Sequence, residues 1–189
     1  MALTQTAQEQ IAMHFASLKS THEVKSIAVD ATCGNGFDTE FLCRLRFTNV
    51  VGFDIQARAI KATQHRLEQA NINANHYELH LSCHTQIADK VVGKIDCAMF
   101  NLGYLPRGDK TVTTQASETI LALQQTQWKL SDTGLISLLC YPGHATGAIE
   151  TRAVEKHLAK LPNHWAVTQY LSNSPSQTSP KLYLIKRQF

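Results

Sequence analysis

The stretch Ala-Val-Asp-Ala-Thr-Cys-Gly-Asn-Gly-Phe-Asp-Thr-Glu-Phe-Leu, residues 28–42, decides the fold. An apolar run ends at Asp30, the turn Gly34-Asn35-Gly36 follows, and a helical pattern begins directly after the turn. A strand, a glycine loop and a helix N-terminus in this order form the usual cradle for a nucleotide-like ligand in an α/β sheet. The glycines let the backbone approach such a ligand without a Cβ clash. A plain strand-to-helix turn is the alternative interpretation.

The acid before the glycines distinguishes between ligands. A dinucleotide-binding loop has to accept a pyrophosphate, and the carboxylate of Asp30 would repel that anion. S-adenosylmethionine (SAM) carries a cationic amino group and a sulfonium, so the same carboxylate would help to hold it. The third glycine of the dinucleotide pattern is also absent, because Thr39 stands in its place. The loop therefore favours SAM as the cofactor.

Composition is that of an ordinary globular protein. The chain has 189 residues, of which 43% are hydrophobic, so we expect a single domain over residues 1–189 with a substantial core. No apolar run is long enough to span a membrane, and the first residues lack the pattern of a signal peptide. The net charge of +3 permits a polyanionic partner without requiring one. Five cysteines without a C-x-x-C pair indicate reduced thiols and a cytoplasmic protein.

Helical and extended patterns alternate after a leading helix within residues 1–20. We expect strands at about 26–30, 49–54, 76–81, 94–100, 133–140, 165–171 and 181–187, and helices at about 36–46, 56–71, 84–91, 114–131 and 146–161. Such alternation predicts an α/β fold with a mostly parallel sheet and helices on both faces. The last two strands should form an antiparallel hairpin. Seven strands ending in a hairpin are the plan of the class I, Rossmann-like methyltransferases.

Ligands of open α/β sheets bind beyond the carboxyl ends of the strands, so the loops after the first four strands should converge there. Asp54, after the second strand, can accept hydrogen bonds from both ribose hydroxyls or cap the next helix. Ile55 and Gln56 would then lie near the adenine. After the third strand, Ser82 and His84 either flank the adenine ring or simply begin a helix.

The segment Asn101-Leu102-Gly103-Tyr104 follows the fourth expected strand, where the transferable methyl group should lie. Amino-methyltransferases carry an Asn- or Asp-Pro-Pro-aromatic signature in this slot, and Leu-Gly replaces Pro-Pro here. The Asn101 oxygen and a neighbouring carbonyl can accept the amine hydrogens and aim the lone pair at the methyl. Tyr104 would pack over the target, and Gly103 lets the backbone come close. A strand-ending turn with a core tyrosine is the alternative.

The segment Tyr141-Pro142-Gly143-His144 follows the fifth expected strand. His144 is a candidate proton acceptor or substrate contact, with a hydrogen-bonding scaffold as the alternative. Tyr141 is a candidate for stacking on a base. The other histidines lack the spacing of metal ligands, so we expect no metal.

These segments together resemble the YtqB-like class I methyltransferases, long labelled rRNA methylases, some of which are the tRNA-modifying enzymes called MnmM. The matching strings are Asp30-Ala-Thr-Cys-Gly-Asn-Gly with Asp38-Thr39, Gly52-Phe-Asp-Ile-Gln56, Asn101-Leu-Gly-Tyr-Leu-Pro-Arg-Gly-Asp-Lys110, Tyr141-Pro-Gly-His144 with Gly147 and Glu150, and Asn173 with Pro180. Two positions depart from the family: Cys33, where we expect a smaller residue, and Phe37, where we expect a histidine.

The resemblance implies methylation of the amine of 5-aminomethyl-(2-thio)uridine at the wobble position, with the tRNA anticodon stem-loop as partner. The catalytic residues would be Asn101, Tyr104 and His144. The cofactor contacts would be Asp30, Thr32, Gly34, Asn35, Gly36, Asp38, Thr39, Asp54, Ile55, Gln56, Ser82, His84, Asn101 and Leu102. The substrate contacts would be Gly103, Tyr104, Arg107, Lys110, Tyr141 and His144.

Two alternatives to this activity stay open at this point. The protein could be a SAM-dependent enzyme that acts on rRNA or on a small amine. It could also belong to another class, as a nucleotide-binding oxidoreductase or an adapter without catalysis. The sequence leaves open whether the chain forms a homodimer.

Overall fold

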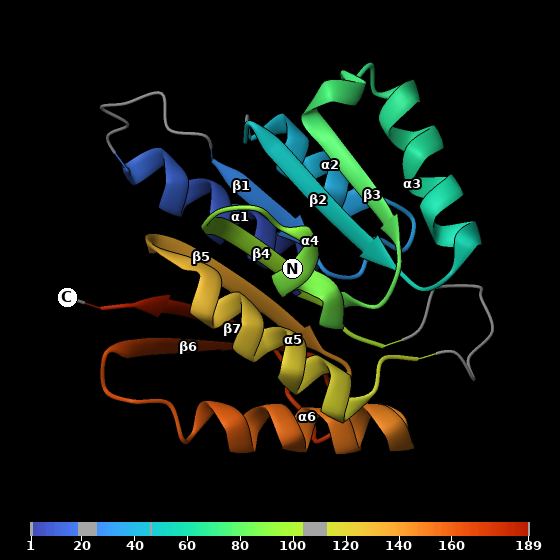
Figure 1. Cartoon of the computed structure of the whole chain (residues 1–189). Coiled ribbons are helices and arrows are strands. Elements are labelled where there is room, and N and C mark those ends of the chain that lie inside the picture. The colour runs from blue at the N-terminus through green and yellow to red at the C-terminus, as the bar shows by residue number, and fades with distance from the viewer. Residues whose placement is uncertain (1, 19–25, 46, 104–112, 189) are drawn as a thin grey trace.

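The seven expected strands form one sheet in a computed structural model of the chain, which describes residues 2–18, 26–45, 47–103 and 113–188 (Figure 1). Their order across the sheet is β3-β2-β1-β4-β5-β7-β6. The strands are β1 (Ile27–Asp30), β2 (Asn49–Asp54), β3 (Tyr77–Leu81), β4 (Ile95–Asn101), β5 (Leu130–Cys140), β6 (Trp165–Leu171) and β7 (Lys181–Arg187).

The strand directions confirm a mostly parallel sheet with a C-terminal antiparallel hairpin. Strands β3, β2, β1, β4 and β5 pair in parallel. Strand β7 lies between β5 and β6 and is antiparallel to both. The order reverses at the β1/β4 pair, where chain connections leave toward opposite edges of the sheet, and such a switch point opens a ligand-binding crevice.

Helices join the strands as the alternating pattern predicts. They are α1 (Leu3–Ser17), α2 (Phe37–Arg44), α3 (Ala57–Gln69), α4 (Ile87–Lys90), α5 (Ala116–Lys129) and α6 (Ala145–Leu158), with the 3-10 turns η1 (Ala74–His76) and η2 (His84–Gln86). The segment expected as one helix at 84–91 is divided into η2 and the short α4.

Strand β5 begins at Leu130, earlier than the expected residue 133. Leu130 pairs with Ile95 of β4, and the register then shifts through an irregularity before Cys97. The Ser131 hydroxyl donates a 2.7 Å hydrogen bond to Asp96 on the neighbouring strand. Residues 130–131, expected as the end of the preceding helix, are therefore part of the sheet, and α5 ends at Lys129.

Two apolar layers cover the two faces of the sheet. Ala28 and Val29 are adjacent in β1 but belong to different layers, as the two-residue period of a strand requires. One layer receives the buried faces of α1, α2 and α3, through residues such as Ile11, Leu42 and Leu67. The other receives α4, α5 and α6, through residues such as Ile87, Leu123 and Val154. Both layers support the strand ends where the functional loops leave the sheet.

Candidate active site

A cavity of about 640 Å³ opens at the carboxyl ends of the parallel strands. Its wall combines the loops after β1, β2, β3, β4 and β5, which are far apart in the sequence. Most of the expected site residues line it together: Thr32, Gly34, Asn35, Asp38, Asp54, Ile55, Gln56, Ser82, His84, Asn101, Leu102, Gly103, Tyr141 and His144.

The glycine loop is fixed to the end of β2 through Asp54. One carboxylate oxygen of Asp54 accepts a 3.0 Å hydrogen bond from the Gly34 N–H, and the other accepts a 2.8 Å bond from the Gln56 N–H. Burial raises the pKa of Asp54 from its ordinary value. Gln56, and not Asp54, is the N-cap of α3, so the Asp54 carboxylate fixes the turn before the helix, and each oxygen retains lone-pair capacity for another donor.

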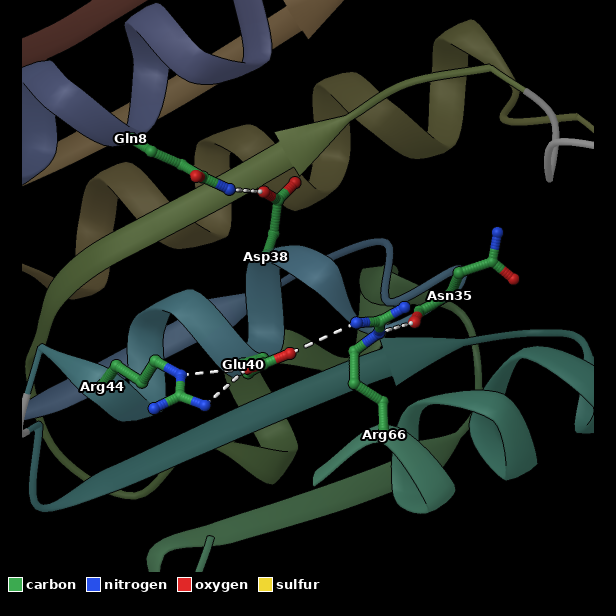
Figure 2. A network of polar contacts seen from close by, with 6 residues as sticks. All are labelled: Gln8, Asn35, Asp38, Glu40, Arg44 and Arg66. Atoms are coloured by element: carbon green, nitrogen blue, oxygen red, sulfur yellow. Dashed lines mark hydrogen bonds and ion pairs between the residues drawn. The ribbon is translucent and has the colours of Figure 1, made fainter. Parts of the chain in front are cut away.

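Helix α3 also holds the loop. Arg66 donates a 2.7 Å hydrogen bond to the Asn35 carbonyl and forms a 3.3 Å ion pair with Glu40 of α2 (Figure 2). Gly36 has a φ of +79° and packs so closely on α3 that an added Cβ would lie 2.8 Å from the Thr63 Cα. The loop conformation therefore depends on glycine at position 36.

Asp30 lies behind the loop, outside the lining of the cavity. Its carboxyl group is fully buried and accepts hydrogen bonds of 2.6 Å from the Thr39 hydroxyl and 3.1 Å from the Thr32 N–H. Burial, with the charge of Asp38 nearby, raises the pKa of Asp30 to about 7. Gly36 and Thr39 are also absent from the lining. These three residues, predicted to contact the cofactor, lie outside the cavity lining and support the loop.

The two positions that depart from the family pattern are both accommodated. The Cys33 sulfur occupies space above Gly52, where an added Cβ would come within 2.6 Å of it. Phe37 lies at the cavity edge with 60% of its surface exposed, and the Arg66 guanidinium lies 3.6 Å from its ring centroid. Phe37 therefore forms a cation–π contact with Arg66 at this position.

The loop after β3 carries two buried polar atoms that have no hydrogen-bond partner among the described residues: Oγ of Ser82 and Nε2 of His84. The other ring nitrogen of His84 lies 3.2 Å from the Ala31 carbonyl, so it carries the proton. Burial lowers the pKa of His84, which keeps the ring neutral and leaves Nε2 as an acceptor. A hydroxyl and an acceptor side by side in the cavity wall suit a polar heterocycle.

Asn101 is the last residue of β4 and lines the cavity. Its backbone N–H donates a 2.8 Å hydrogen bond to the Thr32 hydroxyl. Its side-chain nitrogen lies 3.4 Å from one oxygen of Asp38, and Gln8 of α1 donates a 2.9 Å hydrogen bond to the other oxygen (Figure 2). The asparagine is therefore connected to both the glycine loop and the leading helix.

The chain after Asn101 is fastened by threonine residues that the sequence interpretation missed. The Gly103 N–H donates a 2.9 Å hydrogen bond to the Thr114 hydroxyl, which donates a 2.8 Å bond to Glu150 of α6. Thr119 of α5 donates a 2.5 Å bond to the other oxygen of Glu150. Other lining residues that the sequence interpretation missed are Thr113, Glu118 and Thr178. The expected contacts Tyr104, Arg107 and Lys110 lie outside the described residues.

His144 is the N-cap of α6. Its Nδ1 accepts a 3.1 Å hydrogen bond from the Gly147 N–H and lies 2.8 Å from the Thr146 hydroxyl. An added Cβ at Gly147 would overlap the Tyr141 carbonyl, so this turn needs glycine. His144 therefore has the role of a hydrogen-bonding scaffold, which the sequence analysis gave as the alternative to a proton acceptor or substrate contact. Burial, with the charge of Asp38, raises the pKa of Tyr141 to about 12, which keeps its phenol protonated.

Among residues 2–18, 26–45, 47–103 and 113–188, no cluster of three or more His, Cys, Asp and Glu side chains could hold a metal ion. Within the same ranges, no helix has the length and apolar character needed to cross a membrane. The five cysteines are free thiols, and four of them are buried.

The family model described as “Putative rRNA methylase” matches residues 50–186, well over half of the chain. The chain belongs to this family. This match confirms the resemblance to the YtqB-like methyltransferases that the sequence motifs indicate. A curated relative from Arabidopsis thaliana, named “tRNA (mnm(5)s(2)U34)-methyltransferase, chloroplastic”, is 32% identical over 173 residues. That alignment covers 85% of this chain, and the chain spans 63% of the relative's length.

Solved structures of similar proteins confirm the class I methyltransferase fold. A “putative rRNA-methylase” from Clostridium thermocellum is 31% identical, with a TM-score of 0.87 over 98% of this chain and 97% of that one. A “putative methyltransferase” from Streptococcus mutans, solved in complex with SAH, is 32% identical, with a TM-score of 0.81 over 95% of this chain and 97% of that one. The family and the fold therefore agree with each other.

Proposed function

We propose that the protein is a SAM-dependent methyltransferase that methylates the amine of 5-aminomethyl-(2-thio)uridine at the tRNA wobble position. One observation carries the proposal: Asp54 with its glycine loop and the amide of Asn101 line the same cavity. Family membership and the SAH-bound streptococcal neighbour support methyl transfer from SAM. The name of the Arabidopsis relative supports the tRNA wobble nucleoside as substrate.

The residues of the cavity fit SAM. The carboxylate of Asp54 would accept the ribose hydroxyls, since both of its oxygens keep free lone pairs. The unpartnered Ser82 hydroxyl and the Nε2 acceptor of His84 would bind the adenine edge. Asp38, predicted to contact the cofactor, lines the same wall, where its two oxygens accept from Gln8 and Asn101. When bound, SAM supplies an electrophilic methyl group on a sulfonium.

The chain's own residues bind and orient the amine. The Asn101 oxygen and a neighbouring backbone carbonyl would accept the amine hydrogens, which aims the nitrogen lone pair. The aliphatic ammonium has to lose its proton before it can attack. His144 stays a predicted proton acceptor, although its Nδ1 serves as a helix cap. Positioning therefore supplies most of the acceleration in this proposal.

Contacts with the anticodon stem-loop complete the proposal. Tyr141 lines the cavity as a protonated phenol and can stack on a base. Arg107 and Lys110, predicted to contact phosphates, follow Gly103 in the sequence and lie outside the described residues. Their contribution is a prediction that rests on the sequence alone.

Nucleoside analysis tests the proposed function. Purified protein and SAM are added to tRNA that carries the unmethylated aminomethyl nucleoside, with rRNA treated in parallel, and the digested nucleosides are identified by mass spectrometry. We expect conversion to the methylaminomethyl nucleoside in tRNA, lost with Asn101→Ala. Methylation of the rRNA fraction with unchanged tRNA would overturn the tRNA assignment in favour of the rRNA alternative.

A further inference from the structure

Asn101 can accept an amine hydrogen only if its oxygen, and not its NH₂ group, faces the substrate. The two ends of a primary amide have almost the same shape, so packing alone distinguishes them poorly. With the NH₂ end forward, two donors would face each other and the amine would be turned away. The proposed reaction therefore needs a group that decides which end of this amide is presented.

The side-chain amide of Asn101 contacts the carboxylate of Asp38, whose Oδ2 lies 3.4 Å from Nδ2 of Asn101. An ionised carboxylate can only accept hydrogen bonds, so it draws the NH₂ end toward itself. An oxygen of Asn101 in the same place would face a like partial charge. The opposite end of the amide, the oxygen, is then directed away from Asp38, and Asn101 lines the cavity.

Asp38 is itself held from the other side. Gln8 of α1 donates a 2.9 Å hydrogen bond to Oδ1 (Figure 2). Only 7% of the Asp38 residue is exposed. Each oxygen therefore has its own amide donor, one from the leading helix and one from the end of β4. Because the carboxylate is bonded on both sides, it has little freedom to rotate away from Asn101.

We propose that Asp38, held in place by Gln8, is a positioning residue that presents the oxygen of Asn101 to the substrate amine. The inference rests on the proposed function for the identity of the substrate. It gives the leading helix α1 a role in the active site, because Gln8 is the residue through which that helix reaches the catalytic segment.

Asp38 has to be ionised to accept from Asn101, although a second buried carboxyl group, that of Asp30, lies nearby. Asp30 is completely buried, and its pKa is raised to about 7 by burial and by the charge of Asp38. The hydrogen bonds from Gln8 and Asn101 oppose the rise that burial causes in the pKa of Asp38. These hydrogen bonds favour the charged form of Asp38, which is the form that accepts from Asn101.

A reciprocal exchange tests the proposal directly. Asn101→Asp alone places two carboxylates together and should lower kcat at least about tenfold, a loss of about 1.4 kcal/mol in transition-state stabilisation. Adding Asp38→Asn restores the order of donors and acceptors, because Gln8 then donates to the new amide oxygen at position 38 and the new NH₂ group donates to the carboxylate at position 101. The free oxygen at position 101 again faces the cavity. We expect kcat of the double variant to recover about tenfold over the single variant.

Asp38→Leu keeps the branched shape of the side chain but replaces both acceptor oxygens with slightly larger methyl groups, and it should lower kcat about tenfold while the Kd for SAM changes less than about threefold. Gln8→Leu should give a smaller loss in kcat. Gln5→Leu is the matched control, because Gln5 is exposed on the same helix and its side chain donates to Glu9, one turn further along α1. A double variant as slow as Asn101→Asp, or full activity of Asp38→Leu, would overturn the positioning role. So would a tenfold weaker SAM affinity in Asp38→Leu, because Asp38 would then be a cofactor ligand.

A measurement without turnover separates this inference from the proposed function. In protein labelled with ¹⁵N-asparagine, the side-chain NH₂ signal of Asn101, assigned by its loss in Asn101→Asp, reports the hydrogen bond. We expect slow solvent exchange in the wild-type protein and faster exchange in Asp38→Leu. If the wild-type protein leaves tRNA unmethylated, the proposed function fails, and this exchange difference still decides whether Asp38 holds the amide. Equal exchange in both proteins would contradict the inference.

Discussion

The backbone N–H of Gly34 donates a 3.0 Å hydrogen bond to Oδ2 of Asp54. This bond joins the glycine loop after β1 to the acid at the end of β2, so two motifs read separately in the sequence form one structural unit. The second oxygen of Asp54 accepts from the Gln56 N–H at 2.8 Å, which fixes the carboxylate plane. A cofactor would therefore meet a wall that is already formed before binding.

Asp54→Ala should weaken SAM binding at least about tenfold, or about 1.4 kcal/mol, because the substitution removes the proposed ribose acceptor and releases the glycine loop. Isothermal titration calorimetry with SAM measures the Kd. Asp132→Ala is the control, since Asp132 is exposed on β5 and distant from the cavity lining. Unchanged affinity in Asp54→Ala would contradict the assigned ribose contact.

Gly36→Ala should lower the free energy of unfolding by about 1–3 kcal/mol, because alanine is strained in the left-handed region. Its Cβ would also meet the Thr63 Cα at 2.8 Å. Urea denaturation followed by circular dichroism measures the change. Gly143→Ala should cost less than about 1 kcal/mol, because its nearest atom, the Thr178 carbonyl oxygen, lies 3.4 Å away. Equal stability of both variants would be inconsistent with a strained loop.

Stability should fall as the pH rises toward 7, through Asp30. The pKa of this group is about 7 in the folded protein and ordinarily 3.8, so between these values the folded state holds a proton that the unfolded state has lost. One such proton changes the free energy of unfolding by up to about 1.4 kcal/mol per pH unit. Asp30→Asn should flatten this slope, since the Thr39 hydroxyl can turn to accept from the new amide.

Urea denaturation of wild type and Asp30→Asn at several values between pH 4 and 7 measures both slopes. Asp132→Asn is the control, because an exposed acid should leave the slope as in the wild-type protein. Parallel stability curves for wild type and Asp30→Asn would show that Asp30 takes up no proton on folding.

Most of the sheet could be predicted because its strands are short segments rich in apolar and aromatic residues between clear turns. The observed β2, β6 and β7 have the expected bounds 49–54, 165–171 and 181–187. The early start of β5 could not be foreseen, since Ser131 and Asp132 are polar and only the Asp96 contact shows that they belong to the sheet. The pattern of residues within one strand does not show which residues of the adjacent strand it will contact.

In the cavity, too, some residues could be predicted from local sequence and others only from tertiary structure. Strand-end residues such as Asp54 and Asn101 could be predicted from the topology rule for open α/β sheets. The orientation of Asp30 could not, because an acid at a strand end can face the ligand or turn under the loop toward Thr39. Thr114 and Thr178 enter the wall from segments without any local motif, so their place depends on tertiary structure.

Thr114→Val should lower kcat about tenfold with little change in SAM affinity. The substitution keeps the shape of the side chain but removes the hydroxyl that links Gly103 to Glu150. Steady-state methylation of hypomodified tRNA measures kcat, and calorimetry measures the Kd. Thr168→Val, on the exposed side of the edge strand β6, should leave both unchanged. Full activity in Thr114→Val would mean that the loop after Asn101 is held by other contacts.

A crystal structure of the protein with SAH tests the central claim most directly. We expect the ribose on Asp54, the adenine beside Ile55, Ser82 and His84, and the sulfur directed toward the side chain of Asn101. SAH bound elsewhere, or a cavity between these residues that is filled by the chain's own side chains, would contradict the account.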